Sequence, residues 1–157
     1  MPALSRPHAP ILSPRLSAPC SSLSSIESGQ ACCLDHFVRM FRSDVTTYIN
    51  KLVAKRKPSK IAICMIYFPD ESQPGSWADV ALCCLGYNSK PKQLQATIAK
   101  IFEKATCEIK ISGCEVIPVP MFEVLDGKTT SDYIQRVEPS VSGGRKIAQD
   151  ALHRLGL

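Results

Sequence analysis

The stretch that decides the fold class runs from Ile61 to Phe68 and reads IAICMIYF. It has no charged or strongly polar member, and it lacks the alternation of a strand with one face in water. A short apolar run of this kind is typical of a strand buried on both faces, as in a parallel sheet that helices cover. Pro69, Asp70 and Glu71 end the run. The sequence therefore predicts an α/β fold built around this strand.

A second apolar run, over residues 115–122, predicts another strand of the same sheet. Pro118 and Pro120 have no N–H to donate to a neighbouring strand, so we expect this strand at a sheet edge. Helical patterns alternate with the two strands, over residues 31–57 with Ser43 as a plausible N-cap inside this range, 77–86, 92–106 and the tail after Gly144. This order predicts right-handed crossovers. Two strands are few for a covered parallel sheet, so we expect a domain that is incomplete on its N-terminal side.

Composition and charge exclude several classes of protein. The 157 residues suit one domain, and 45% hydrophobic with 21% charged residues is ordinary for a globular chain. No apolar run approaches the length of a membrane span, and a net charge of +5 is too modest to indicate a nucleic-acid partner. The eight cysteines show no C-x-x-C spacing. We interpret them as buried thiols in a reducing, cytoplasmic environment, with Cys107 and Cys114 able to pair if oxidised.

The first 30 residues differ from the rest of the chain. They hold eight serines and five prolines, and no acidic residue precedes Glu27. Prolines at this density preclude a continuous helix. We therefore expect a disordered Ser/Pro-rich extension over residues 1–30, ahead of a domain over residues 31–157. An alternative interpretation is an organellar transit peptide, in which Arg6 and Arg15 supply the positive charge.

The best candidate for chemistry is the stretch over residues 115–144, which reads EVIPVPMFEVLDGKTTSDYIQRVEPSVSGG. Here an apolar run passes into acidic and hydroxyl residues and then into a helix start, and open α/β sheets place their sites at such junctions. Three other interpretations stay open. Ser142, Gly143 and Gly144 could bind an anion through backbone amides. Four carboxylates could bind a hard cation, and these are Glu123, Asp126, Asp132 and Glu138. The loop could also be a helix start and nothing more.

From about Phe41 to Leu155 the chain resembles the C-terminal half of the SGNH (GDSL-like) hydrolase superfamily. The similarity is carried by Tyr67-Phe68-Pro69-Asp70-Glu71 after the first strand, Phe122-Glu123 after the second, and Val137-Glu138-Pro139-Ser140-Val141-Ser142-Gly143-Gly144 before the last helix. The resemblance implies a three-layer α/β/α, flavodoxin-like parallel sheet, truncated at its N-terminal side. It also implies a hydrolase of small esters that works without a bound cofactor or metal.

Members of the family use a Ser nucleophile in a Gly-Asp-Ser motif, oxyanion donors from a Gly and an Asn, and an Asp-x-x-His pair. Such sites must deprotonate a weak nucleophile and hold the developing oxyanion. This chain has no Gly-Asp-Ser, and it reads Ser28-Gly29-Gln30-Ala31-Cys32-Cys33 where a Gly-x-Asn-Asp block is expected. By position in the last loop, the resemblance implies catalytic roles for Asp132, Glu138 and Ser140, with Glu138 where the family has a histidine.

The sequence thus predicts the C-terminal part of an SGNH-type ester hydrolase, inactive alone because its nucleophile and oxyanion blocks are missing. The alternative is a non-catalytic α/β interaction module. In that interpretation, the sheet edge left open where earlier strands should lie would pair with a partner or with a second copy of the chain.

Overall fold

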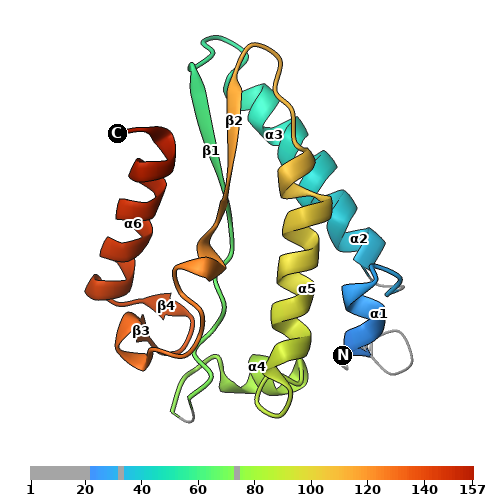
Figure 1. Ribbon diagram of the computed structural model, residues 1–157, viewed down its shortest axis with the longest axis vertical. Coiled ribbons are helices and arrows are strands. Elements are labelled where there is room, and N and C mark those ends of the chain that lie inside the picture. The colour runs from blue at the N-terminus through green and yellow to red at the C-terminus, as the bar shows by residue number, and fades with distance from the viewer. Residues whose placement is uncertain (1–21, 32–33, 73–74) are drawn as a thin grey trace, which may run out of the picture.

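The structure, a computed structural model, describes residues 22–31, 34–72 and 75–157. Two parallel strands lie at its centre, with α2, α3 and α5 on one side and α6 on the other (Figure 1). The main elements are α1 (Leu23–Glu27), α2 (Leu34–Arg39), α3 (Val45–Leu52), β1 (Lys60–Met65), α4 (Asp79–Cys84), α5 (Pro91–Lys104), β2 (Glu115–Pro120), β3 (Tyr133–Ile134), β4 (Glu138–Pro139) and α6 (Val141–Leu155). The α/β class is confirmed. The described strands form one two-stranded parallel sheet and one short antiparallel hairpin, so the larger flavodoxin-like sheet is not seen.

The parallel pairing of the two predicted strands is confirmed. Lys60 lies opposite Glu115, and the register continues to Met65 opposite Pro120. The prediction that β1 is buried on both faces is wrong. Ile63 and Met65 are buried against the helices, but Cys64 is exposed and Ile66 is half-exposed. The physical reason is coverage, because α6 is the one described helix on the second face and it shields only part of the sheet.

The first long helix begins within the predicted range but differs from its prediction at Ser43 and at its end. Helical structure begins at Leu34, passes through a π-helical segment at Met40–Asp44 and ends at Leu52. Ser43 is therefore inside the helix rather than its N-cap, and its carbonyl accepts a hydrogen bond from Thr47 Oγ1 at 2.8 Å. Leu34, at the start of the helix, is almost fully buried in the core. The other helix predictions are confirmed within two or three residues, and Gly86 has the expected left-handed conformation after α4.

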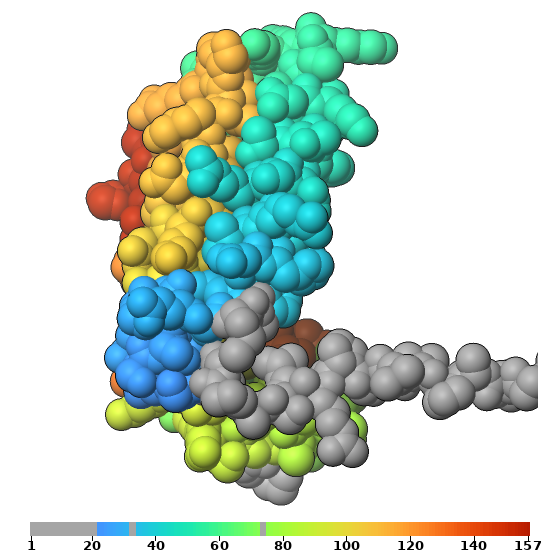
Figure 2. All heavy atoms as spheres, turned by 90° about the vertical axis from the view of Figure 1, so that its right-hand side faces the viewer, coloured from blue at the N-terminus to red at the C-terminus, as the bar shows by residue number. Residues whose placement is uncertain are grey.

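The packed structure also begins earlier than the expected boundary at residue 31. Leu23–Glu27 form α1, and Ile26 is buried against α5. Figure 2 shows α1, α5 and the α2–α3 helix side by side on one face. The part of the expected extension over residues 1–21 lies outside the described residues.

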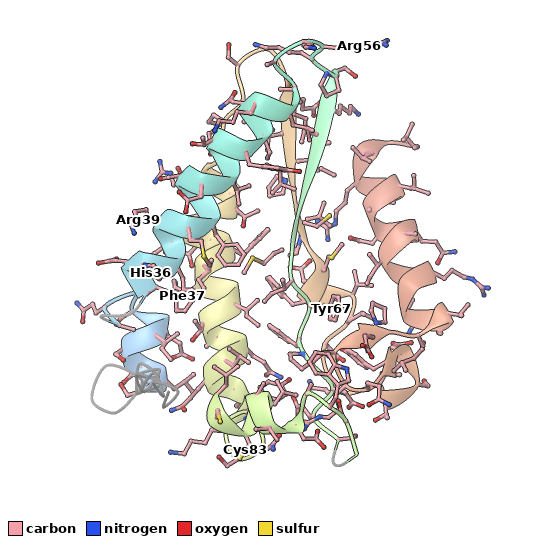
Figure 3. All side chains as sticks on the ribbon, turned by 180° about the vertical axis from the view of Figure 1, so that it is seen from behind. His36, Phe37, Arg39, Arg56, Tyr67 and Cys83 are labelled. Atoms are coloured by element: carbon pink, nitrogen blue, oxygen red, sulfur yellow. The ribbon has the colours of Figure 1, made fainter. Side chains whose placement is uncertain are left out.

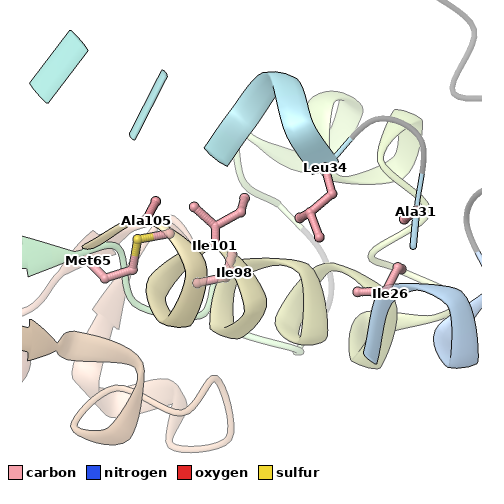
Figure 4. Packing of buried hydrophobic residues seen from close by; sticks show 7 residues of the cluster. All are labelled: Ile26, Ala31, Leu34, Met65, Ile98, Ile101 and Ala105. Atoms are coloured by element: carbon pink, nitrogen blue, oxygen red, sulfur yellow. The ribbon is translucent and has the colours of Figure 1, made fainter. Parts of the chain in front are cut away.

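Two apolar clusters hold the helices to the sheet. One joins α1, α2 and α5 to Met65 at the end of β1, and Figure 4 shows its buried members, which are Ile26, Ala31, Leu34, Met65, Ile98, Ile101 and Ala105. The other joins α3 to the sheet through Ile49, Val53, Ile63, Ile109 and Ile111. Each fully buried side chain of this size contributes about 2 kcal/mol by leaving water. The clusters thus place the carboxyl ends of β1 and β2 beside each other.

The cysteines depart from the prediction of buried thiols. Among the described residues, Cys64, Cys83 and Cys84 are exposed, while Cys107 and Cys114 are half-buried and not bonded to each other. Burial raises the pKa of the Cys64 thiol, and nearby Asp150 raises it further. No described helix combines the length and the apolar character that a lipid bilayer crossing requires.

Candidate functional site

Polar side chains gather at the carboxyl ends of the two parallel strands, where α/β sheets commonly bind ligands. The segment after β1 brings Asp70 there, and the segment after β2 brings Thr130 and the β3–β4 hairpin. Together they line a polar pocket of about 200 Å³, and the lining residues are Asp70, Ser72, Gly75, Ser76, Thr130, Tyr133, Gln135 and Arg136.

Asp70 is buried at the floor of this pocket. Its Oδ1 accepts hydrogen bonds from the Ser72 backbone N–H at 2.9 Å and from Thr130 Oγ1 at 3.3 Å. Its own backbone N–H donates to the Arg136 carbonyl at 2.8 Å. The hydroxyls of Ser72 and Thr130 lie 2.7 Å apart at the mouth. The carboxylate is thus held in one orientation by groups from both strand ends.

Arg136 ties three segments together from the tip of the hairpin. Its Nε donates to the Asp70 carbonyl at 3.1 Å, and its Nη1 donates to Asp79 Oδ1 and Asn88 Oδ1, both at 2.9 Å. The hydrogen bond from Arg136 is the main reason that the pKa of Asp79 lies below its ordinary value. Gln135 and Arg136 both have positive φ, at 53° and 68°, a conformation that costs free energy for residues other than glycine. The hydrogen bonds of Arg136 offset that cost.

Three tyrosine hydroxyls fasten the loops around the pocket. Tyr67 donates to the Val137 carbonyl at 2.6 Å, Tyr87 to the Pro69 carbonyl at 2.5 Å and Tyr133 to the Phe68 carbonyl at 2.8 Å. Figure 3 labels Tyr67 beside the hairpin. Burial raises the pKa of Tyr87 to about 12 and the pKa of Tyr133 further above its ordinary value. These phenols are therefore neutral hydrogen-bond donors at physiological pH.

Two of the three predicted catalytic residues lie together at the start of α6. Ser140 is the N-cap of this helix, and its Oγ accepts from the Gly143 N–H at 3.2 Å and donates to the Ser131 carbonyl at 2.7 Å. The Ser140 N–H donates to the Asp132 carbonyl at 2.8 Å. The buried Asp132 carboxylate accepts from Lys146 Nζ at 2.6 Å and from Ser142 Oγ at 3.2 Å.

The third predicted residue, Glu138, has a different partner. Its Oε1 accepts a hydrogen bond from Trp77 Nε1 at 3.1 Å, which links β4 to the segment before α4. Its charge also raises the pKa of nearby Tyr67, after burial, which is the larger cause. The structure thus brings Asp132 and Ser140 together and directs Glu138 toward Trp77. Their part in catalysis stays a prediction.

The groups required by the anion-binding and cation-binding interpretations of the loop already have partners within the chain. The Gly143 amide donates to the Ser140 cap, so it is engaged within the helix start. Of the four carboxylates weighed as cation ligands, Glu123 pairs with Arg154, Asp132 pairs with Lys146, and Glu138 meets Trp77. Across residues 22–31, 34–72 and 75–157, no three His, Cys, Asp or Glu side chains gather as metal ligands would.

The stretch over residues 115–144 contains four residues of the pocket lining, but sequence reasoning named none of them as a site residue; they are Thr130, Tyr133, Gln135 and Arg136. Asp70 follows a predicted strand and could have been found as a strand-end carboxylate. Arg136 and Thr130 give no local signal, because the hairpin that places them has only two residues in each strand. Comparison of the chain with protein-family models, with curated proteins and with solved structures found no match. The resemblance to SGNH hydrolases therefore rests on the residues quoted for it.

Proposed function

We propose that this chain forms the C-terminal part of an SGNH-type ester hydrolase, with a flavodoxin-like arrangement that further strands would complete. The observation that carries the proposal is the position of the polar loops. Both parallel strands end at one pocket, and the Asp132–Ser140 loop enters α6 beside it, on the side of the sheet opposite α5. In this proposal the chain supplies the acid/base loop and one wall of a site for a small ester.

The same geometry argues that the chain alone lacks turnover. The Ser140 hydroxyl is used as a helix cap and donates its proton to the Ser131 carbonyl, so no base is placed to activate it. The described histidines, His36 in α2 and His153 in α6, are absent from the lining of the polar pocket. The Glu138 carboxylate accepts a hydrogen bond from Trp77 Nε1, and the Ser140 hydroxyl donates its proton to the Ser131 carbonyl instead.

The first experiment measures hydrolysis of p-nitrophenyl acetate by the purified chain and by Ser140→Ala. We expect no turnover that depends on Ser140. Turnover that disappears in Ser140→Ala would overturn the proposal that the nucleophile is supplied elsewhere.

A second experiment gives a positive readout. The chain is co-expressed with a fragment of an SGNH hydrolase that carries the Gly-Asp-Ser and Gly-x-Asn-Asp blocks. The proposal expects restored turnover that falls in Asp132→Asn and Glu138→Gln. Restored turnover that neither substitution changes would show that the loop is not the acid/base part of the site.

A second candidate function is an interaction module, and the open edge of β1 favours it. The Glu115 N–H donates to the Ser59 carbonyl at 2.8 Å, so the ladder with β2 uses the odd-numbered residues of β1. The backbone groups of Ala62 and Cys64 therefore point away from β2, and no further described strand pairs with β1 on that side. At the opposite edge, Pro118 and Pro120 block pairing along β2. Strand addition is thus open at β1 and closed at β2.

A further inference from the structure

An apolar groove lies next to the open edge of β1. It has a volume of about 350 Å³ and is lined by side chains from α1, α2, the π-helical segment, the end of β1, α5 and the residue after α4. Ile66 directly follows the last residue of β1, and its side chain lines the groove. Three lining residues are large and well exposed, with Ile66 at 50%, Leu85 at 48% and Met40 at 37%. An apolar surface of this kind, continuous with unpaired backbone, fits an extended peptide.

Strand addition would use both features at once. A peptide paired with β1 would satisfy the outward backbone groups of Ala62 and Cys64. Because side chains alternate along a strand, every second side chain of that peptide would face the helices and could enter the groove. The backbone bonds supply affinity, and the groove selects for apolar residues at alternate positions.

The charge around this surface indicates the kind of partner. Residues 34–60 run from the groove, which Phe37, Met40 and Phe41 line, to the start of β1, and they carry seven Lys or Arg residues and two acids, Asp35 and Asp44. The seven basic side chains are exposed, and none forms an ion pair with a described acid; they are Arg39, Arg42, Lys51, Lys55, Arg56, Lys57 and Lys60. Figure 3 labels Arg39 on α2 and Arg56 between α3 and β1, at opposite ends of this helical stretch.

This charge disfavours two of the possible occupants. A second copy meeting the first through the same surface would bring the two basic stretches together, and like charges repel. Residues 1–21 of this chain contain Arg6 and Arg15 and no acid, so they offer no complementary charge. An acidic segment of another polypeptide complements the surface.

We propose that the open edge of β1 and the adjoining groove bind an extended acidic segment of another polypeptide with apolar residues at alternate positions. This inference rests on the interaction function proposed above and decides its partner. It competes with the hydrolase proposal for the edge of β1, because strands that complete the sheet could pair only there, although the groove and the polar pocket share no lining residue.

The probe is a fluorescein-labelled synthetic peptide of alternating valine and glutamate, titrated with the chain by fluorescence anisotropy. A peptide of alternating valine and lysine is the matched comparison. We expect binding of the glutamate peptide, weaker binding as salt increases, and no binding of the lysine peptide. Equal binding of the two peptides, or binding of the lysine peptide alone, would overturn the charge argument.

Three variants separate the contributions. Cys64→Pro removes an outward N–H without removing a donor to β2, and Ile66→Glu places a charge in the groove; each should abolish binding. Arg39→Glu combined with Arg42→Glu should weaken binding by about tenfold. The control, Lys92→Glu combined with Lys128→Glu, makes the same change in net charge at exposed sites outside this surface and should leave binding unchanged.

Sedimentation of the chain alone distinguishes the remaining outcomes. A monomer that binds the glutamate peptide supports the inference. A dimer that Cys64→Pro dissociates would support edge pairing but overturn the acidic partner. A monomer that binds neither peptide would overturn both. A single-stranded oligonucleotide provides the last test. If it displaces the peptide from the parent chain and binds Cys64→Pro as tightly as it binds the parent chain, the basic residues of 34–60 bind nucleic acid, and the inference is overturned.

Discussion

Gly143 and Gly144 are neighbours in the first turn of α6, yet the structure predicts opposite effects when each is replaced by alanine. A Cβ on Gly143 would lie 2.1 Å from the Asp132 carbonyl oxygen and 3.1 Å from its carbonyl carbon. A Cβ on Gly144 would meet nothing within 4 Å. Neither glycine has a positive φ, so the difference is one of space alone.

The cost of Gly143→Ala follows from what it would displace. The obstacle is a backbone oxygen, which cannot rotate aside, so the start of α6 must move by more than an ångström relative to the 129–132 segment. That movement disturbs the Ser140 cap and the bond from the Ser140 N–H to the Asp132 carbonyl. Overpacking of this kind costs about 1–3 kcal/mol and a cap about 1 kcal/mol, against a gain of up to about 1 kcal/mol in helix propensity. We expect Gly143→Ala to lower the free energy of unfolding by about 2 kcal/mol.

Gly144→Ala is the matched control, because it makes the same chemical change one residue along the same helix. It gains helix propensity without a clash and should raise the free energy of unfolding by up to about 1 kcal/mol. Urea unfolding followed by circular dichroism measures both variants, and their melting temperatures should differ by on the order of 10 °C. If Gly143→Ala proved as stable as Gly144→Ala, the close approach of α6 to Asp132 would be refuted.

Three further substitutions test the packing and electrostatics of the site. Ser140→Ala removes the N-cap of α6 and should cost about 1 kcal/mol in urea unfolding, whereas Ser140→Asn should keep most of it. Asp79→Asn should destabilise the chain at neutral pH. Because the pKa of Asp79 is lowered in the folded state, its charged form adds stability above about pH 4, and that stability is lost as the pH falls through the folded pKa. The stabilities of the variant and the parent should therefore converge in acid. Met65→Ala should cost about 3 kcal/mol in the same assay, because this side chain is almost fully buried between β1 and the helices, and an unchanged midpoint would contradict the packing of the first cluster.

Local sequence patterns predicted most of the regular elements. The apolar runs located β1 and β2, and the two prolines of β2 placed it correctly at an edge. Periodicity and a C-terminal glycine located α4 and α5. The patterns that predict these elements each span only a few neighbouring residues, so they can be recognised in a single sequence.

The errors arose where distant contacts override local signals. Ser43 looks like an N-cap, but it lies inside a helix that starts at the buried Leu34 and continues through the π-helical segment. Cys64 sits in an apolar run, but it is exposed because one helix covers its face of the sheet only in part. Neither the coverage of a sheet nor the start of a packed helix is encoded in a window of neighbouring residues.

The sequence by itself determined that this chain is an α/β protein and that its polar chemistry follows the second strand. Only the tertiary structure decided which polar groups meet. It joined Asp70 to Thr130 and Arg136 to Asp79 across some sixty residues of chain, and it turned Glu138 toward Trp77 and away from Ser140. The physical reason is that hydrogen bonds and charge pairs depend on the distance between the two groups in space. For these residues, the packing of β1, β2 and the β3–β4 hairpin against α4 and α6 sets that distance.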